Sequence, residues 1–392
     1  MIIKLKVILN NSILIISLNI FTFLINIYFL TRKNKYKFNN VDLFQIYHLR
    51  KSFIQISNFL NTKYFYNKKV DINNSQTRNN KEKIILIDFV DFLYNNKKFI
   101  GYLRHIFPKN RYNYKFVLDT NNPDYVIFDV FGCQHNNPKY NRSIKIAFFS
   151  ENILPDFNEA DYALAHAHFF YLDRYFKYPS YIWNFNKYFH YRKYNLEKIR
   201  KEVLKSSIRS KFCAAVISSN YSFQFRLDFI KELNKYKKVD MGGKAYNNIG
   251  SKVLNKINFL SSYKFSIAME NTDGDGYITE KILESFIAGT IPIYYGNYMV
   301  DEYINPKAYI LIKGKKDIKN KINYIKKIDN DNNLYMSILR EKVFLWDNVS
   351  KIIENERLLF FQHIFEQNIN FSKRIDDSNR PLKCELEENY II

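Results

Sequence analysis

Short apolar runs alternate with amphipathic segments from about residue 82 onward, and this alternation predicts an α/β protein. Three runs in the first part of the chain, 83–90 (KIILIDFV), 124–132 (DYVIFDVFG) and 143–150 (SIKIAFFS), have the length and composition of buried strands. Continuous apolar runs are typical of parallel strands, because helices cover both faces of a parallel sheet. The segments between the runs are long enough to hold crossover helices.

The alternation pauses at a polar, lysine-rich stretch over 191–210, which we interpret as a linker or an exposed helix. Beyond it, the pattern predicts strands at 211–218, 264–270 and 291–296 and helices at 225–236 and 277–288. Gly289 lies just past the second of these helices, where glycine is favoured as a cap. The simplest architecture is two α/β domains that join near residue 205.

The same pattern divides the chain into segments of different character. We predict a tail at 1–12, a membrane-anchor helix at 13–30, a polar linker or stem at 31–81, a first Rossmann-like domain at 82–205, a second at 206–365, and a C-terminal tail at 366–392.

The anchor is predicted from segment 13–30, which contains no charged residue and has the minimum length for a bilayer span. Lysines precede it, and a stronger basic cluster at 32–37 follows it, so the positive-inside bias favours a cytoplasmic body. No small-residue cleavage site follows the apolar run, which argues against a signal peptide. A buried helix of the first domain is the alternative interpretation.

Composition supports a globular chain, since 47% of its 392 residues are hydrophobic and 25% are charged. The formal net charge of +22 is carried mainly by lysine, which lacks the planar fork that arginine uses to recognise phosphates and bases. We therefore expect a solvated basic surface and no nucleic-acid partner, with a functional nucleic-acid-binding patch as the alternative. Cys133, Cys213 and Cys384 lie far apart and predict neither a disulfide framework nor a zinc site; Cys213 is expected to be buried.

The stretch 271–282 (NTDGDGYITEKI) raises the question of metal binding. As a calcium loop it lacks its last ligand, because the twelfth position is Ile282 instead of a bidentate glutamate. Asp273 and Asp275 match an Asp-x-Asp metal pair, but aspartate and glycine are also ordinary turn residues. From these residues alone, the turn and the metal site stay open alternatives.

Glu280 and Lys281 fall in the first turn of the predicted helix that follows this stretch. The helix dipole favours an acid at that end and disfavours a cation. A lysine there is explained if an anion lies between its ammonium and the free N–H groups of the first turn. The alternative is a solvated lysine in a lysine-rich chain.

Read as a whole, segment 264–310 resembles the signature block of the α1,3-fucosyltransferases, family 10 of the glycosyltransferases. The matching elements are F-x-x-A-x-E-N, G-Y-x-T-E-K-I, A-G-T-x-P-I-Y-x-G and N-P-K, in that order. Segments 148–179 and 213–243 resemble further parts of the family. The departures are mild: the family's G-E-N is Ser150-Glu151-Asn152 here, Tyr295 replaces the usual aromatic before Gly296, and the cysteine pairs of the animal members are absent.

The resemblance implies a GT-B fold, with the acceptor on the first domain and GDP-fucose on the second. It implies inverting transfer of L-fucose from GDP-β-L-fucose to a sugar hydroxyl of a glycan, α1,3 to GlcNAc. It also implies no tightly bound cofactor, no metal site and a divalent cation that at most stimulates. Asp273 and Asp275 then lie in a loop that varies within the family.

The resemblance also implies roles for individual residues. Glu151 matches the proposed general base, and Arg226 matches the arginine that meets the donor diphosphate. In the donor pocket, Glu280 would bind the ribose hydroxyls and Lys281 would offset charge on the departing GDP. Asn271 and Tyr277 would shape the pocket around fucose and phosphate.

These observations together predict a single-pass membrane enzyme with a nucleotide sugar and a glycan as partners. In a eukaryotic secretory system it would be of the Golgi type, but the charge bias around 13–30 points the other way, so its orientation stays open. Two other functions remain as alternatives: a metal-dependent glycosyltransferase that uses Asp273 and Asp275, and a basic membrane-anchored binding protein without activity.

Overall fold

A computed structural model of the chain describes residues 82–92, 94–168, 171–178, 181, 195–218, 224–345 and 349–374. Within these ranges no helix combines the length and the apolar character that a bilayer span requires. The anchor predicted at 13–30 lies outside the described residues and stays a prediction.

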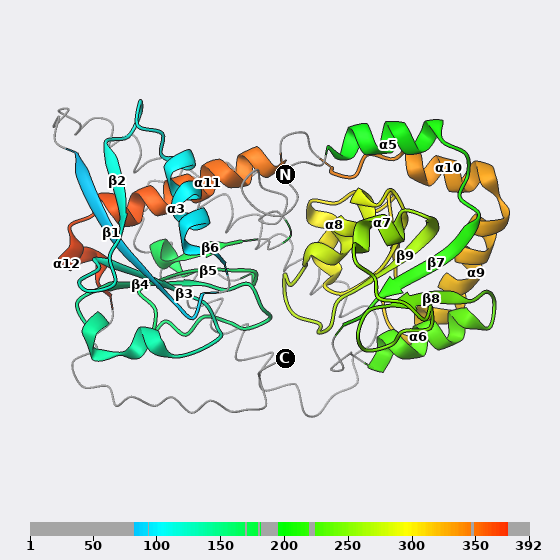
Figure 1. The fold of residues 1–392 in the computed structure, drawn as a ribbon, viewed down its shortest axis with the longest axis horizontal. Helices are drawn as coiled ribbons and strands as arrows, with labels where there is room; N and C mark the ends of the chain where they lie inside the picture. Colours follow the sequence, from blue (N-terminus) through cyan, green and yellow to red (C-terminus); the bar gives the residue numbers. More distant parts are fainter. Residues whose placement is uncertain are drawn as a thin grey trace, which may run out of the picture. The chain divides into compact units, whose positions relative to one another are not determined.

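In the first half of the described chain, six parallel strands form one sheet in the order β2-β1-β3-β4-β5-β6 (Figure 1). The strands are β1 Lys83–Val90, β2 Tyr114–Leu118, β3 Tyr125–Phe128, β4 Ile144–Phe148, β5 Tyr162–Ala165 and β6 Tyr175–Lys177. The three predicted strands of this part are confirmed as β1, β3 and β4. The other three, of three to five residues each, were not among the predicted strands.

The second half contains five described strands, also parallel, in the order β11-β10-β9-β7-β8. They are β7 Lys211–Val216, β8 Val239–Gly242, β9 Tyr263–Met269, β10 Ile291–Tyr295 and β11 Ile310–Leu311. The predicted strands are confirmed as β7, β9 and β10, which form the middle of the sheet. The α/β class predicted from the apolar runs is therefore confirmed for both halves.

The helices of the described residues follow between and after these strands. They are α3 Asn96–Ile106, α5 Leu196–Lys205, α6 Gln224–Asn234, α7 Lys256–Leu260, α8 Glu280–Ile287, α9 Ile318–Asn330, α10 Asn332–Arg340, α11 Val349–Glu366 and α12 Ile369–Ser372. The predicted helices at 225–236 and 277–288 are confirmed as α6 and α8. Helix α5 forms within the lysine-rich stretch that was interpreted as a linker or an exposed helix.

Helices cover the second sheet on both faces, which explains why most residues of its strands are apolar. Successive residues of β7 point to opposite faces. Cys213 and Ala215 pack in one apolar cluster with residues of α6 and α9, whereas Ala214 packs in another with Leu260 of α7. Cys213 is a buried free thiol, as its surroundings predict. Cys133 is disulfide-bonded, a pairing that the spacing of the cysteines did not predict.

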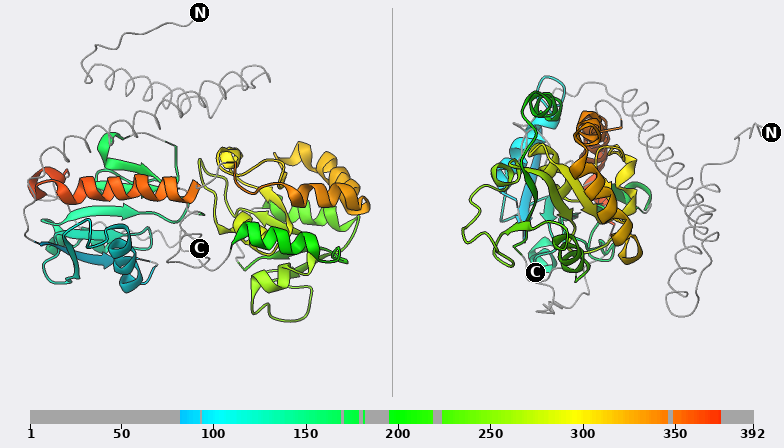
Figure 2. Two further views of the ribbon diagram at one scale, coloured as in Figure 1. Left: turned by 90° about the horizontal axis from the view of Figure 1, so that it is seen from above. Right: turned by 90° about the vertical axis from the view of Figure 1, so that its right-hand side faces the viewer.

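Aromatic rings dominate the core of the first half. Phe99 of α3 contacts Phe148 of β4 edge to face at 5.4 Å, and Phe365 of α11 contacts Tyr125 of β3 at 5.0 Å. Helix α11 thus packs along the first sheet, as both ribbon views show, although its residues fall within the predicted second domain (Figures 1 and 2). The predicted boundaries at 205 and 365 stay predictions, but the chain returns to the first sheet before its end.

Gly289 ends α8 with a left-handed backbone, as the sequence predicts, since its φ is +69°. Its N–H donates to the carbonyl of Phe286 at 2.9 Å, and the N–H of Thr290 donates to Ser285 at 3.0 Å. A Cβ atom at this position would lie 2.5 Å from Cγ2 of Val203 and 2.8 Å from a guanidinium nitrogen of Arg209. Both the backbone angle and the packing of α5 therefore require glycine here.

Substitution Gly289→Ala is expected to destabilise the protein through both effects. Gly250 is a matched control, because its φ is +72° but a Cβ there would meet nothing within 4 Å. We expect Gly250→Ala to lower the free energy of unfolding by about 1 kcal/mol, through the backbone conformation alone. We expect Gly289→Ala to lower it by about 3 kcal/mol, because the added methyl must also displace neighbouring side chains. Urea denaturation measures both values, and equal losses would contradict the steric argument.

Candidate active site

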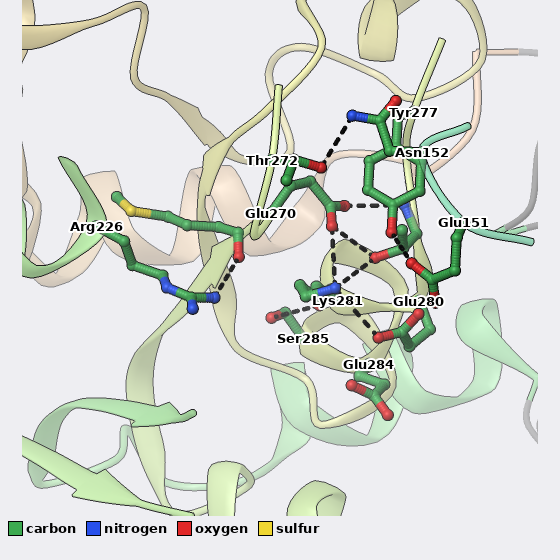
Figure 3. A network of polar contacts seen from close by, with 12 residues as sticks. Glu151, Asn152, Arg226, Glu270, Thr272, Tyr277, Glu280, Lys281, Glu284 and Ser285 are labelled. Carbon is green, nitrogen blue, oxygen red and sulfur yellow. Dashed lines mark hydrogen bonds and ion pairs between the residues drawn. The ribbon is translucent and has the colours of Figure 1, made fainter. Parts of the chain in front are cut away.

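Charged and polar side chains gather at the carboxyl ends of the strands, where α/β sheets bind ligands. Glu151 lies three residues after β4, and Glu270 directly follows β9. The hydroxyl of Tyr277, in the loop between β9 and α8, donates to Glu151 Oε2 at 3.0 Å. This hydrogen bond connects the two strand ends across 126 residues of sequence (Figure 3).

Glu151 lies in an environment that favours the protonated form of a carboxylate more than water does. Burial raises its pKa above the usual glutamate range, and the negative charges of Glu280 and Glu270 add to this effect. The hydrogen bond from Tyr277 and the charge of Lys281 oppose the shift, but the net direction is upward. A general base is most efficient when its pKa approaches the operating pH.

The residue before Glu151 ties this loop to the neighbouring strand. Ser150 Oγ donates to Asp129 Oδ2 at 2.8 Å, directly after β3. Asp129 is fully buried, and burial raises its pKa to about 6. The hydrogen bond of Ser150 holds the backbone next to Glu151 and so limits where the Glu151 side chain can lie.

Lys281 lies at the centre of the charged cluster at the N-terminus of α8 (Figure 3). Its Nζ is 3.0 Å from Glu270 Oε2 and 3.4 Å from Glu280 Oε1. Burial by itself lowers the pKa of Lys281, but the charges of Glu270 and Glu280 outweigh it, and the pKa is raised. The cation that the helix dipole disfavours is thus held by two carboxylates and stays charged.

Glu280 is the more accessible of these two carboxylates, with 35% of its side chain exposed. Burial raises its pKa, but the charges of Lys281 and Lys256 outweigh burial, and the net shift is downward. Glu280 therefore stays ionised and can accept hydrogen bonds from hydroxyl groups of a ligand.

Arg226 lies on α6, behind the same strand end. Its Nη1 donates to the carbonyl of Met269, the last residue of β9, at 3.3 Å. The residue is buried, and its Nε has no hydrogen-bond partner among the described residues. Burial lowers its pKa, an effect that the charge of Glu270 opposes. A buried guanidinium with an unused donor is a candidate for recognising an anion.

The structure brings most of the predicted site residues together. Lys281, Glu280 and Glu270 form one cluster of ion pairs. Its charges act on Glu151, to which Tyr277 donates a hydrogen bond. Arg226 joins this cluster through the Met269 carbonyl, next in sequence to Glu270. Asn271 follows Glu270, and its side-chain oxygen is buried without a hydrogen-bond partner in the described part of the chain. Its predicted place in the pocket stays a prediction.

Sequence reasoning missed several residues that hold this cluster. The most important is Glu270, which is fully buried although it is charged. Its position at the end of a buried strand was the available signal. Asn152 also was missed: its Nδ2 donates to Thr272 Oγ1 at 2.9 Å, and its Oδ1 is 3.2 Å from His166 Nε2. Asn152 also packs closely against Gly274. A Cβ atom at position 274 would lie 1.9 Å from Asn152 Oδ1, so a larger residue there would collide with Asn152.

Asp273 and Asp275, which match an Asp-x-Asp metal pair in the sequence, differ in their surroundings. Asp275 is engaged by His168, whose Nδ1 lies 3.4 Å from Oδ1 and whose backbone N–H donates to Oδ2 at 3.3 Å. For Asp273, burial raises the pKa. In the described ranges, no three histidine, cysteine, aspartate or glutamate side chains form a group that could hold a metal ion.

His168 also contacts a second carboxylate, that of Glu302. Its Nε2 is 3.1 Å from Glu302 Oε2, and Lys177 Nζ of β6 is 2.5 Å from the same oxygen. His168 is nearly inaccessible, with 2% of its side chain exposed. This cluster fastens the loop of Asp275 to residues that follow β5 and to β6.

These features define an α/β protein with two parallel sheets and a charged site at their strand ends. Comparison with known families then gives the particular family. Residues 204–358 match the model described as glycosyltransferase family 10 (fucosyltransferase) C-term, and residues 87–184 match that of the alpha-(1,3)-fucosyltransferase FucT N-terminal domain. Together the two matches span well over half of the chain. The chain belongs to the family 10 fucosyltransferases.

Individual relatives agree with this assignment. The chain is 29% identical over 281 residues to alpha-(1,3)-fucosyltransferase FucT of Helicobacter pylori, which covers 62% of this chain and 58% of that protein. It is 33% identical over 161 residues to a putative fucosyltransferase of Acanthamoeba polyphaga mimivirus, covering 38% of this chain and 26% of that one. The matches thus span less than two thirds of these curated relatives.

Solved structures resemble the chain over more of its length. A crystal structure of an α1,3-fucosyltransferase with GDP-fucose has a TM-score of 0.56 and 27% identity, and covers 78% of this chain and 96% of that chain. Another, with GDP, has a TM-score of 0.58 and 25% identity over the same shares.

Glu302 provides a test of the His168 cluster. Burial raises its pKa, but the hydrogen bond from His168 and the charge of Lys177 outweigh burial and lower the pKa to about 2. A lowered pKa stabilises the fold above the unfolded value near 4.5, and this stabilisation is lost as the pH falls toward 2. We expect Glu302→Gln to lower the free energy of unfolding by on the order of 3 kcal/mol at pH 7.

The difference between wild type and Glu302→Gln should shrink as the pH falls below about 4.5, as followed by urea unfolding at several pH values. Glu232→Gln is the control, because its pair with Lys235 is exposed and is expected to contribute less than about 1 kcal/mol. A loss from Glu302→Gln that does not depend on pH would contradict the ion-pair argument.

Proposed function

We propose that this protein is an inverting α1,3-fucosyltransferase of the GT-B type that moves L-fucose from GDP-β-L-fucose to a hydroxyl of a glycan acceptor. One observation carries the proposal: Glu151, a carboxylate with a raised pKa, is hydrogen-bonded to Tyr277 beside the Lys281 cluster. A proton acceptor and a cationic anion site are thus adjacent at the strand ends. Family membership and the GDP-fucose in a structural relative support the same donor.

In this reaction Glu151 acts as the general base. It takes the proton of the acceptor hydroxyl while that oxygen attacks C1 of fucose from the side opposite GDP. The C1–O bond to the diphosphate breaks, its electron pair leaves with GDP, and the β-linked donor gives an α-linked product. A single carboxylate is sufficient for one such displacement.

The departing diphosphate gains negative charge, which Arg226 and Lys281 are placed to offset. The free N–H groups at the N-terminus of α8 add a further favourable dipole. Lys281 already has carboxylate partners, but its contact with Glu280 is long at 3.4 Å, and Glu280 is partly exposed. A phosphate oxygen can replace that contact, and Glu280 is then free to accept hydrogen bonds from the ribose hydroxyls.

The remaining parts of the proposal concern the acceptor and the location of the protein. The family favours transfer to GlcNAc, with no tightly bound cofactor and a divalent cation that at most stimulates. The apolar segment 13–30 favours a single-pass membrane protein, of the Golgi type in a eukaryotic secretory system. Fucose transfer distinguishes this proposal from that of a binding protein without activity.

The general base is tested by Glu151→Gln. The amide cannot accept the proton, so we expect the transfer rate to fall by about 10²–10⁴ while GDP binding is retained. Transfer of labelled fucose to an acceptor array and calorimetric GDP titration measure the two properties. Asp156→Asn is the matched control, because this acid lies in the same loop and is exposed. Undiminished transfer by Glu151→Gln would refute the assigned base.

The same assay separates the metal-dependent alternative. We expect transfer to persist in excess EDTA, because the proposed charge compensation comes from Arg226 and Lys281. Loss of transfer both on chelation and in the double variant Asp273→Asn/Asp275→Asn would favour a metal site. His168→Asn controls for the structural role of Asp275, since it breaks the same contact without removing a carboxylate.

The pH profile tests the environment of Glu151. The base must be deprotonated, so transfer declines as the pH falls through a pKa that lies above the ordinary value of 4.5. Tyr277→Phe removes a hydrogen bond that favours the charged form, so the acid limb of kcat/KM should move to still higher pH. Tyr324→Phe is the control, because this tyrosine is exposed on α9. An acid limb that Tyr277→Phe leaves in place or shifts downward would contradict this interpretation.

A further inference from the structure

Glu270 is a charged residue that the mechanism above does not use, although no part of it is exposed. A buried carboxylate is costly unless hydrogen bonds and an opposite charge compensate for the lost water. Here Oε1 accepts from the backbone N–H of Thr279 at 2.8 Å, and Oε2 accepts from Thr279 Oγ1 at 2.6 Å. Oε2 also lies 3.0 Å from Lys281 Nζ.

The position of this carboxylate is determined from several sides. The backbone N–H of Glu270 donates to the carbonyl of Tyr295 at the end of β10, at 2.8 Å. Gly296 packs against the side chain so closely that a Cβ there would lie 2.7 Å from Cγ of Glu270. These contacts fix the position of the Glu270 carboxylate. The ion pair between Glu270 and Lys281 then limits where the Lys281 ammonium can lie.

Thr279 completes the connection between the strand and the helix. It is the N-cap of α8, but its hydroxyl makes no capping bond to the helix. The hydroxyl instead donates to Glu270 and accepts from Lys281 Nζ at 2.9 Å. Strand β9, the start of α8 and the ammonium group are thus joined through one carboxylate.

The two carboxylates beside Lys281 differ in how accessible they are and in how close they lie to its Nζ. Glu280 is one-third exposed and 3.4 Å away, so a ligand can displace it. Glu270 is inaccessible and 3.0 Å away, so it remains as the permanent partner. Its charge also acts on Arg226, the other cation of the site.

On these contacts we propose that Glu270 is a positioning residue for fucose transfer, which holds the Lys281 ammonium at the N-terminus of α8 where the diphosphate leaves. This inference rests on the proposed function. Glu270 touches no reacting atom. It offsets the unfavourable helix dipole at Lys281 and keeps one N–H of the ammonium free to face the leaving group when Glu280 is displaced.

The test compares wild type with Glu270→Gln, Lys281→Met and the double variant. Glutamine has the same shape, but it turns an acceptor for Lys281 into an N–H donor or a neutral oxygen. We expect Glu270→Gln to lower kcat by about 10–100-fold and to change the KM for GDP-fucose by less than about 5-fold. The double variant should be no slower than Lys281→Met alone, because Glu270 acts through that lysine.

Asp329→Asn is the matched control for a general loss of stability. Asp329 is also buried and paired with two lysines, Lys237 and Lys264, but it lies on α9 and makes no contact with the cluster. We expect it to lower the melting temperature without lowering kcat. If Glu270→Gln does not fold, Glu270→Asp keeps the charge with a shorter side chain, and its kcat should fall between those of wild type and Lys281→Met.

A second measurement does not depend on activity. Lysine side chains labelled with ¹³C report the titration of Lys281 by NMR, and its pKa should be lower in Glu270→Gln than in wild type. An unchanged pKa, or a double variant whose losses multiply, would overturn the positioning role. If wild type transfers no fucose, the proposed function fails, and the Lys281 titration still decides whether Glu270 holds the ammonium.

Discussion

Parallel sheets covered by helices on both faces leave only the ends of their strands for polar chemistry. In this protein that constraint explains where Glu151 and Glu270 lie, whereas Arg226 belongs to α6 and Glu280 and Lys281 to the first turn of α8. Most residues of the strands are apolar and buried, Glu270 directly follows β9, and Glu151 lies three residues after β4. The cores behind them are packed mainly with aromatic and aliphatic side chains, among which a charge is costly unless it is paired. The site is therefore a consequence of how the sheets are covered.

Electrostatic balance decides what these strand ends can do. Glu151, Glu270 and Glu280 oppose the two cations Lys281 and Arg226 within one small region. Each pKa shift there follows from its neighbours: burial raises that of Glu151, whereas two carboxylates raise that of Lys281. The proposed displacement of a diphosphate calls for a carboxylate with a raised pKa and a lysine that stays charged, and one region of the structure holds both.

Much of the fold was predictable because its strongest signals are local. The long apolar runs of β1, β7 and β9 and the amphipathic pattern of α8 are each visible within ten residues of sequence. Short strands such as β6 and β11 were missed, because two or three residues carry no periodic pattern. The return of α11 to the first sheet was also missed, since Phe365 and Tyr125 are distant in sequence and meet only through packing.

The sequence by itself determined the class of fold and the order of the main elements, because these depend on local pattern. An ordered motif also led it to propose the site residues Glu151, Arg226, Asn271, Tyr277, Glu280 and Lys281. Only the tertiary structure decided which of them are in contact and who their partners are. The hydrogen bond between Tyr277 and Glu151 joins residues 126 positions apart, and Glu270 became visible only as a buried charge. Asp275, conspicuous in the sequence, is held by His168 because folding brings the two loops together. Partnership between buried charges is a property of three-dimensional packing, which no local pattern encodes.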